Sequence, residues 1–261
     1  MLELKHIDKS FNLTGKKEDT NVVLKDLNLT IEEGEFVVVI GSNGSGKSTT
    51  MNIITGSLIP EKGQVILDGE DITKKKEYQR AKYFGRVFQD PKMGTSADMS
   101  VIENLEIAYK RGERHSPLTW GFKKEHKEIF IDELKRFDLG LEDRLNQKVG
   151  CMSGGQRQAL TLLMATLQKP KVLLLDEHTA ALDPKTAKKV LELTEKIIKE
   201  NHLTAIMVTH NMKDAIKYGD RLVMFHSRKI IYDVKGEEKA KLSAHDLMEM
   251  FENAEKEEEN E

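Results

Sequence analysis

The feature that most constrains the fold is a glycine-rich run placed directly after a short apolar segment. Residues 36–40 are apolar and of strand length, and the next residues read Gly41-Ser42-Asn43-Gly44-Ser45-Gly46-Lys47-Ser48. They fit the pattern G-x-x-x-x-G-K-[ST], in the context of a strand, a loop and a following helix. Glycines let the backbone wrap closely round phosphate groups and point its N–H groups at them. The run is therefore predicted to bind the phosphates of a nucleotide.

The polar residues at the end of this loop indicate which part of the nucleotide is held. Lys47 can reach the β and γ phosphates, and the hydroxyl of Ser48 can ligate the Mg²⁺ that bridges them. The N-terminus of the following helix adds positive potential for an anion. The candidate nucleotide-binding residues of this segment are Gly41, Ser42, Asn43, Gly44, Ser45, Gly46, Lys47, Ser48 and Thr49.

Two adjacent carboxylates follow a second apolar run later in the chain. Residues 172–175 read Val-Leu-Leu-Leu, and Asp176 and Glu177 come directly after them. The end of a buried parallel strand presents its side chains to the crevice where α/β folds bind ligands. Asp176 is therefore a candidate Mg²⁺ ligand, and Glu177 a candidate general base for attack of water on the γ phosphate.

The hydrophobic periodicity predicts strands first, then helices, and then strands alternating with helices. Such an alternation implies a parallel sheet, and Ser100 is expected to cap the first helix of the middle part. The expected strands are residues 7–11, 22–31, 36–40, 63–69, 84–88, 172–176, 204–209, 221–226 and 229–234. One helix is expected to start at residue 100, and further helices are expected at 123–137, 156–167, 184–201, 211–218 and 243–251. Residues 14–21 are expected to form a hairpin loop.

The run Met152-Ser153-Gly154-Gly155-Gln156 at the start of a predicted helix resembles the signature sequence of ATP-binding cassette (ABC) proteins. A serine and two glycines at a helix start offer N–H groups and a hydroxyl to an anion. In ABC proteins this segment contacts the γ phosphate held by the opposite subunit. The resemblance implies that ATP is bound between two such chains, with Ser153, Gly154, Gly155 and Gln156 supplied by the partner.

Other positions match the family's pattern in the expected order. Phe11 resembles the aromatic residue that stacks on adenine, and Gln89 the glutamine that senses Mg²⁺ and the attacking water. Asp183 lies in a segment that resembles the loop crossing the dimer interface, and His210 resembles the switch histidine at the γ phosphate. The resemblance thus makes Gln89 and His210 catalytic with Lys47 and Glu177, makes Gln89 a metal residue with Ser48 and Asp176, and places ATP and Mg²⁺ as cofactors.

The chain also departs from the family's pattern at two positions. Met152 replaces the commoner Leu, which is nearly a volume-conserving exchange. His178 follows Glu177 where Pro or Ala is frequent, and it is expected to be an exposed loop residue.

The resemblance implies an α/β fold: a P-loop NTPase with a RecA-like mixed sheet, an antiparallel β subdomain and an inserted α-helical subdomain. One nucleotide-binding domain is expected over residues 1–261. Its catalytic core and β subdomain would take 1–90 and 170–235, its helical signature subdomain 91–169, and its C-terminal helix and acidic tail 236–261.

Composition limits the cellular location of the chain and the partners that it can bind. No stretch approaches the roughly 20 apolar residues that span a bilayer, and the start of the chain lacks the apolar core of a secretory signal. Cys151 is the one cysteine, so an internal disulfide is excluded. The net charge of −3, with both signs interspersed, disfavours a nucleic-acid partner. We expect a cytoplasmic subunit, peripheral on the inner face of the membrane.

Three kinds of ABC protein compete as explanations. A transporter subunit that drives separate permease chains is favoured, with import ahead of export and, in that case, an extracytoplasmic substrate-binding protein as a further partner. A soluble ABC factor acting on ribosomes or nucleic acid normally carries two cassettes, and a DNA-repair ATPase would carry a long coiled coil before the signature. Residues 88–95 and 176–184 resemble cassettes associated with aromatic amino-acid uptake.

Overall fold

The computed structural model describes residues 1–12, 20–112, 124–137 and 140–259. The chain divides into two compact units, which are described separately. The first unit consists of Met1–Arg80 and Thr204–Glu261, and the second consists of Ala81–Leu203.

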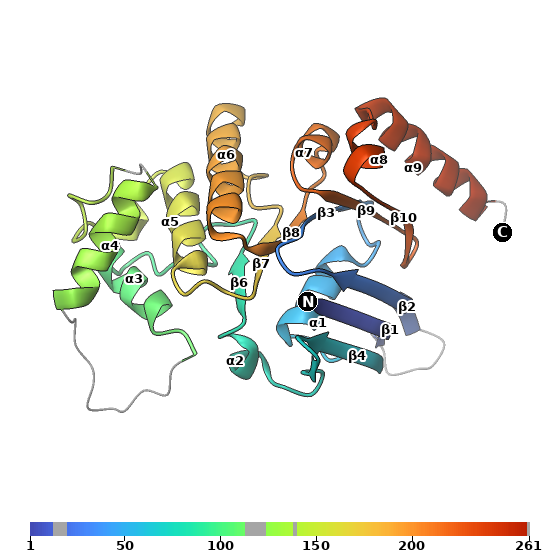
Figure 1. The fold of residues 1–261 in the computed structure, drawn as a ribbon, viewed down its shortest axis with the longest axis horizontal. Helices are drawn as coiled ribbons and strands as arrows, with labels where there is room; N and C mark the ends of the chain where they lie inside the picture. Colours follow the sequence, from blue (N-terminus) through green and yellow to red (C-terminus); the bar gives the residue numbers. More distant parts are fainter. Residues whose placement is uncertain (13–19, 113–123, 138–139, 260–261) are drawn as a thin grey trace. The chain divides into compact units, whose positions relative to one another are not determined.

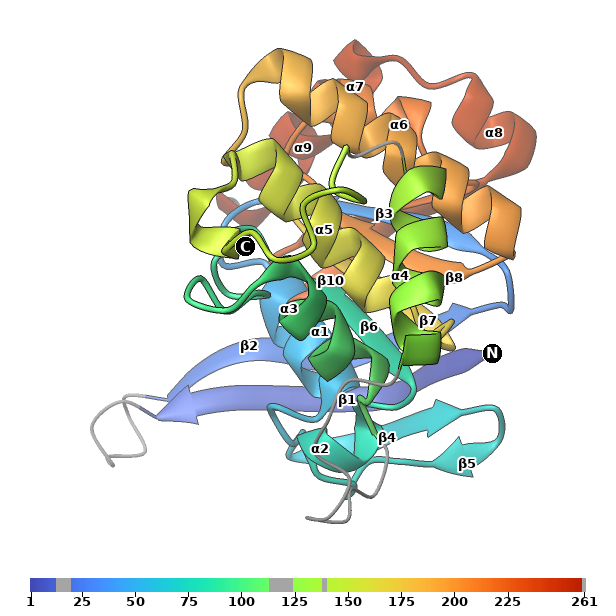
Figure 2. The same ribbon diagram turned by 90° about the vertical axis from the view of Figure 1, so that its left-hand side faces the viewer.

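An antiparallel sheet forms one part of the first unit (Figures 1 and 2). Its strands lie in the order β2-β1-β4-β5. Their bounds are β1 (Leu2–Asn12), β2 (Thr20–Ile31), β4 (Lys62–Leu67) and β5 (Glu70–Asp71). Leu27, Leu29 and Ile31 alternate with exposed residues along β2 and are buried, as the period of two predicts. Of the loop predicted at residues 14–21, positions 14–19 fall outside the described residues, and positions 20 and 21 begin strand β2 instead.

Parallel strands form the other part of the first unit. Strand β3 (Phe36–Gly41) pairs in parallel with β8 (Thr204–Val208) on one side and β9 (Arg221–His226) on the other, and β10 (Lys229–Lys235) pairs antiparallel with β9. Every residue of β3 is buried, which accounts for its continuous apolar composition. The predicted parallel arrangement is therefore confirmed around β3.

Helices pack on the first unit, which contains the antiparallel sheet and the parallel strands around β3. They are α1 (Lys47–Thr55), α2 (Glu77–Arg80), α7 (Met212–Lys217), α8 (Gly236–Ala240) and α9 (Ala244–Glu259). Helix α1 begins directly after the glycine-rich loop and packs against β2 and β3. Helix α7 packs against both β3 and α9, so the C-terminal helix lies beside the segment that follows β8.

The second unit combines a parallel strand pair with a group of helices. Strand β6 (Phe84–Val87) pairs in parallel with β7 (Val172–Asp176). The helices are α3 (Val101–Tyr109), α4 (Lys124–Arg136), α5 (Gly154–Thr166) and α6 (Pro184–Asn201). Helix α5 packs against β6, α3 and α6 and so occupies the middle of this unit. The helical block predicted after residue 100 is confirmed, with element ends shifted by a few residues.

Local capping chemistry explains where the helices of the second unit begin. The hydroxyl of Ser100 accepts from the Glu103 N–H, and the Glu103 carboxylate accepts from the Ser100 N–H at 2.7 Å, so the predicted cap is confirmed. Such a reciprocal pair satisfies two N–H groups that would otherwise lack partners at the helix start. Asp183 caps α6 in a similar way, followed by Pro184.

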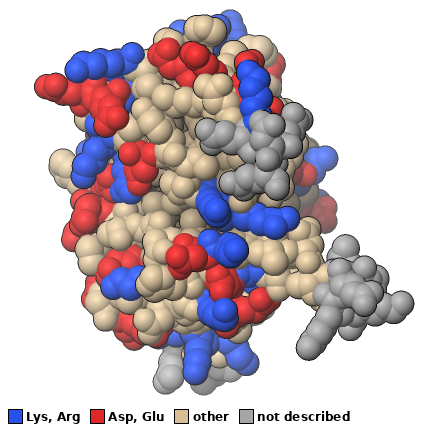
Figure 3. All heavy atoms as spheres, turned by 90° about the vertical axis from the view of Figure 1, so that its right-hand side faces the viewer, with Lys and Arg blue, Asp and Glu red and all other residues tan. Residues whose placement is uncertain are grey.

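The surface is mixed in charge, and none of the described helices combines the length and apolarity required to cross a bilayer. On the face shown in Figure 3, Lys and Arg side chains alternate with Asp and Glu side chains rather than forming a basic field. This distribution agrees with the interspersed charges read from the sequence.

Candidate nucleotide-binding site

The glycine-rich loop of the first unit has the backbone conformation that its glycines predict. Gly44 and Gly46 have φ angles of 82° and 104°, in the left-handed region that other residues rarely adopt. A Cβ atom on Gly46 would lie 2.5 Å from Leu24 Cδ2, whereas one on Gly44 would meet no atom within 4 Å. Gly46 is therefore required for close packing against β2, and Gly44 mainly for the turn.

Lys47 is folded across the loop rather than extended into solvent. Its side chain is buried, with 6% exposed. Its ammonium group donates to the carbonyl oxygens of Gly41 and Ser42, each at 2.8 Å, and lies 3.5 Å from Ser45 Oγ. The positive charge is thus held inside the curve of the loop, where phosphate oxygens can exchange for these acceptors. Ser48 is exposed on the first turn of α1, and Thr49 beside it is half-buried.

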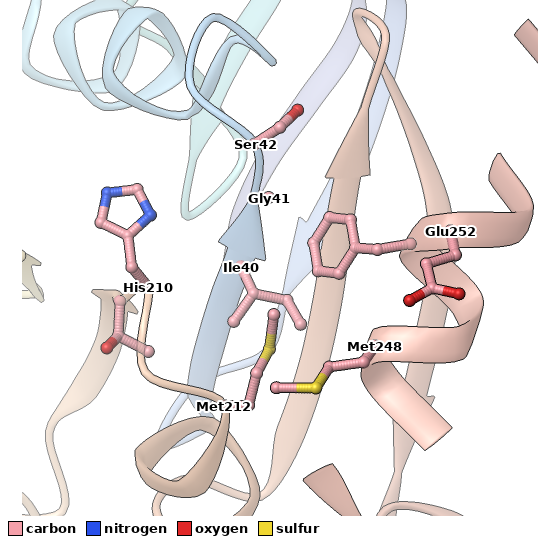
Figure 4. A pocket seen from close by; sticks show the side chains of 9 residues that line it. Ile40, Gly41, Ser42, His210, Met212, Met248 and Glu252 are labelled. Carbon is pink, nitrogen blue, oxygen red and sulfur yellow. The ribbon is translucent and has the colours of Figure 1, made fainter. Parts of the chain in front are cut away.

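His210 lies beside the start of this loop, as the resemblance implies. A cavity of about 320 Å³ is lined by Gly41, Ser42, Thr209 and His210 together with apolar side chains and the carboxylate-bearing Glu252. Figure 4 shows the side chains of Ile40, Met212 and Met248 converging on this cavity, with His210 across it. The Thr209 N–H donates to the Val39 carbonyl at 3.1 Å, which ties the His210 segment to β3.

Phe11, the candidate adenine-stacking residue, is half-buried near the end of β1, where it pairs with Asn21 of β2. Lys9 Nζ lies 5.4 Å from the centroid of the Phe11 ring, within the range of a cation–π contact. The same ring can stack on a base, because an aromatic face accepts either a cation or a second π system. Whether Phe11 has that role remains a prediction.

Asp176, the candidate Mg²⁺ ligand, lies at the end of β7 in the second unit. Its Oδ2 accepts from Arg86 Nη2 at 2.9 Å, and both side chains are mostly buried, with 17% and 16% exposed. Arg86 comes from the adjacent strand β6, and its guanidinium carbon lies 4.8 Å from the centroid of the Phe88 ring. A charged partner at this distance holds the Asp176 carboxylate in one orientation. The sequence analysis did not identify Arg86.

Glu177, the candidate general base, follows Asp176 with an unusual backbone conformation. Its φ angle is 46°, in the left-handed region that costs a residue with a side chain about 1–2 kcal/mol. Its carbonyl accepts from the Ala180 N–H at 2.9 Å, so a tight turn begins at this residue. Such strain persists only where the surrounding structure holds it.

The expectation that His178 is exposed is wrong. Its side chain is 1% exposed, and its Nε2 lies 3.1 Å from the Thr194 hydroxyl of α6. Burial lowers the pKa of His178 to about 4, so the ring is neutral at pH 7. The turn that starts at Glu177 directs this side chain into the unit and not toward solvent. A visible signal was present in the sequence, because Thr194 falls on the apolar stripe of the helix 184–201.

The signature segment begins helix α5 in the second unit. The Ser153 hydroxyl accepts from the Gln156 N–H, and Gln156 Oε1 accepts from the Ser153 N–H, both at 3.3 Å. Ser153 and Gly154 are exposed. A Cβ atom on Gly155 would lie 2.1 Å from Thr186 Cγ2 of α6, so this glycine permits a close approach of two helices. The segment is thus a rigid helix start with an accessible serine.

The segment around Gln89 is tied to the signature helix. Gln89 itself is exposed and lies two residues after the end of β6. The side chain of Gln158, fully buried in α5, donates to the Phe88 carbonyl at 3.1 Å. Arg157 donates to Thr95 Oγ1 at 2.5 Å. A shift of the segment 88–95 would therefore be transmitted to helix α5 through Gln158 and Arg157. The sequence analysis did not identify these two residues.

Asp183 closes the connection from β7 to α6. Its Oδ1 accepts from the Thr186 N–H at 3.1 Å, which caps α6. Hydrogen bonds from the side chain and the backbone N–H of Thr186 lower the pKa of Asp183 below its usual value. Asp183 is exposed, as a residue that meets a partner chain would be.

The predicted site residues fall into two groups. Phe11, the glycine-rich loop, Ser48 and His210 belong to the first unit, where Gly41, Ser42 and His210 line one cavity. Gln89, the signature segment, Asp176, Glu177 and Asp183 belong to the second unit. Among the described residues, no group of three or more His, Cys, Asp or Glu could hold a metal ion.

Comparison with known proteins places these features in one family. The family model described as "ABC transporter" matches residues 24–180. A tyrosine transport ATP-binding protein of Clostridioides difficile (strain R20291) is 47% identical over 258 residues, which covers 97% of this chain and 100% of that protein. The ABC transporter ATP-binding protein YtrE of Bacillus subtilis (strain 168) is 35% identical over 218 residues, covering 81% of this chain and 89% of that protein.

Solved structures agree with the sequence relatives. An ATP-binding cassette in a dimeric post-hydrolysis state bound to ADP and Pi superposes with a TM-score of 0.76 at 30% identity, covering 90% of this chain and 98% of that one. The ADP conformation of an ATP-binding cassette from an ABC transporter superposes with a TM-score of 0.77 at 29% identity, covering 94% of this chain and 95% of that one.

Proposed function

Because the chain belongs to the ABC transporter family, we propose that it is the ATP-hydrolysing subunit of a transporter for tyrosine or a related aromatic amino acid. It has the cassette fold that the sequence predicts, with a mixed parallel sheet and an antiparallel subdomain. The observation that carries the proposed cargo is the 47% identity to a tyrosine transport ATP-binding protein along that protein's whole length. Import is the direction that we propose.

In the proposed site, each side chain has one task. Phe11 stacks on adenine, and the glycine-rich loop with Lys47 binds the phosphates. Glu177 accepts a proton from the attacking water, Gln89 orients that water, and His210 contacts the γ phosphate. General-base catalysis of this kind contributes about 10²–10⁴-fold to the rate. The burial of Lys47 inside the phosphate loop and the exposure of His210 beside it support these separate roles.

A second copy of the chain completes the site in this proposal. Ser153, Gly154, Gly155 and Gln156 of the partner would close over the γ phosphate, and Asp183 would cross the interface. The exposed Ser153 at a helix start supports this role, because such a helix terminus attracts an anion. The dimeric form of a solved relative with ADP and Pi also supports it.

Mg²⁺ is the proposed metal, held by Ser48, Gln89 and Asp176. Hydroxyl, amide and carboxylate oxygens are the hard ligands that Mg²⁺ prefers, and the ion keeps phosphate oxygens in its shell. When bound, Mg²⁺ neutralises charge that develops on the phosphates during transfer. Arg86 pairs with Asp176 at 2.9 Å and holds its carboxylate in one orientation, which supports a prearranged ligand.

The proposed partners are separate permease subunits, with an extracytoplasmic substrate-binding protein for an importer. The proposed location is the cytoplasm, at the inner face of the membrane. A soluble ABC factor acting on ribosomes or nucleic acid is the alternative, and the mixed charge of the face in Figure 3 gives it no support.

The test is uptake of labelled tyrosine into cells that lack this gene and carry it back on a plasmid. We expect wild type to restore ATP-dependent uptake and Glu177→Gln to bind ATP without restoring it. Phenylalanine and an aliphatic amino acid serve as competitor and control. Full tyrosine uptake by cells that contain only Glu177→Gln would contradict the proposed ATPase role. Restored uptake of another compound but not of tyrosine would contradict the proposed cargo.

A further inference from the structure

His178 is a buried polar residue with no task in the proposed chemistry. It directly follows Glu177, and its side chain is 1% exposed. A histidine buried in this way needs a hydrogen-bond partner, because an unsatisfied polar group inside a protein is costly. That partner is Thr194, which lies on the buried face of α6 and is itself 1% exposed.

The direction of this hydrogen bond follows from the second bond that Thr194 makes. Thr194 Oγ1 lies 2.7 Å from the Val190 carbonyl oxygen, which can only accept. The single hydroxyl proton is therefore directed along helix α6. His178 Nε2, at 3.1 Å from the same oxygen, must then be the donor. The ring carries its proton on Nε2 and not on Nδ1.

The backbone on both sides of His178 is held. Before it lies β7, whose residues Val172–Leu175 are buried and paired with β6. After it, the Ala180 N–H donates to the Glu177 carbonyl at 2.9 Å and the Leu182 N–H donates to the Thr179 carbonyl at 3.1 Å. Glu177 sits at the junction with a left-handed φ of 46°. A residue with a side chain keeps that conformation only where the surrounding structure holds it.

We propose that His178 is a positioning residue for Glu177, acting through its hydrogen bond to Thr194. The bond fixes the first turn after β7 on helix α6 and holds the Glu177 backbone in its left-handed conformation, so that the carboxylate keeps one direction. The inference rests on the proposed role of Glu177 as general base. His178 touches neither nucleotide nor water in this account.

The first test separates the hydrogen bond from the volume of the ring. His178→Leu fills a similar space without a donor, and His178→Gln keeps an N–H donor at similar reach. ATP hydrolysis by the full-length protein gives kcat and KM separately. We expect His178→Leu to lower kcat by about 10-fold to 100-fold, since small misplacements cost that much, with KM for ATP within about twofold. His178→Gln should recover part of kcat, and equal kcat for the two variants would overturn the proposal.

A second pair of variants changes the acceptor and leaves the loop untouched. Thr194→Val removes the hydroxyl but keeps the branched shape, and Thr194→Ser keeps the hydroxyl. The valine variant should lower kcat with an unchanged KM, and the serine variant should retain most of kcat. Because both are small changes on a helix, they remain informative if His178→Leu fails to fold. Wild-type kcat in Thr194→Val would overturn the proposal.

The ring tautomer supplies a measurement that does not depend on catalysis. Nitrogen-15 spectra of histidine-labelled protein, assigned with His178→Gln, should show the proton of His178 on Nε2. A proton on Nδ1 would contradict the deduced direction of the bond and overturn the proposal.

Glu177→Gln, measured in parallel, distinguishes failure of this inference from failure of the proposed function. If Glu177→Gln keeps full turnover, Glu177 is not the base, and both ideas fail. If Glu177→Gln loses turnover while His178→Leu and Thr194→Val keep it, the proposed function stands and only the positioning role of His178 is lost.

Discussion

Two connections from a buried strand to a helix carry most of the proposed chemistry, and they are built differently. The loop from β3 to α1 turns at Gly44 and Gly46, and its interior is held by the ammonium group of Lys47. The connection from β7 to α6 has no glycine between Glu177 and Asp183. It is held by a buried histidine and by a cap on the helix.

The difference indicates two strategies for placing charge near a phosphate. In the first connection, Lys47 bonds carbonyl groups that phosphate oxygens can replace, so the loop is shaped to exchange partners with a ligand. In the second connection, His178 and Asp183 bond α6, so these bonds join two parts of the protein to each other. A prearranged base needs no reorganisation at the moment of reaction.

The largest expected effects come from removing the charged group of each connection. Lys47→Ala removes a buried cation with two carbonyl partners and should weaken ATP binding by more than about tenfold, since one charged hydrogen bond is worth about 1.5–3 kcal/mol. Glu177→Gln should lower kcat by about 10²–10⁴-fold. It should leave ATP affinity within about twofold. Calorimetric titration measures the ATP affinity of both variants, and a hydrolysis assay measures their kcat. Loss of ATP binding in Glu177→Gln would contradict the separation of binding from catalysis between the two connections.

A smaller effect is expected from filling the first connection with a methyl group. Gly46→Ala places a Cβ 2.5 Å from Leu24 Cδ2, in addition to the strain of a positive φ. Gly44→Ala shares the positive φ but meets no atom within 4 Å, so it is the matched control. Overpacking costs typically about 1–3 kcal/mol, so Gly46→Ala should lose more ATP affinity and more thermal stability than Gly44→Ala. Titration with ATP and melting curves test this, and equal losses would mean that packing against β2 is unimportant.

The smallest expected effect concerns the helix cap of the second connection. The lowered pKa of Asp183, caused by its hydrogen bonds with Thr186, means that the ionised side chain stabilises the folded protein. That stabilisation is present above the unfolded pKa near 3.8 and is lost as pH falls through the lowered folded value. Asp183→Asn should melt slightly below wild type at pH 7, and the difference should shrink on acidification toward pH 3. Asp183→Ala, which lacks an acceptor, should melt lower than Asp183→Asn. A difference that grows on acidification would contradict this assignment.

The strand and the turn of the first connection could be predicted from the sequence because their chemistry is local. An apolar run and spaced glycines define a strand and a loop within residues 36–46, and phosphate binding by Lys47 stays a prediction. Local chemistry also predicts the strand 172–176 and the cap at Ser100, which bonds Glu103 three residues away.

The second connection was predicted only in part because its support is distant in sequence. His178 bonds a residue 16 positions away, and Asp176 pairs with Arg86, 90 positions away. A residue in a turn has no periodicity that tells which way it points, so exposure was the wrong prediction for His178. Thr194 held the available clue, because it is a polar residue on the apolar stripe of the helix 184–201 and can accept a hydrogen bond there.

In the proposed dimer, each nucleotide is held by the phosphate loop of one chain and the signature segment of the other. Mixing two variants that should each be inactive alone, Lys47→Ala and Ser153→Arg, is the decisive experiment. In a mixed dimer, one site combines an intact loop from the Ser153→Arg chain with an intact signature from the Lys47→Ala chain. We expect equal amounts of the two variants to regain about a quarter of wild-type ATP hydrolysis, because random pairing makes half of the dimers mixed and each mixed dimer has one intact site of two. A mixture as inactive as its components, although mixed dimers form, would contradict it.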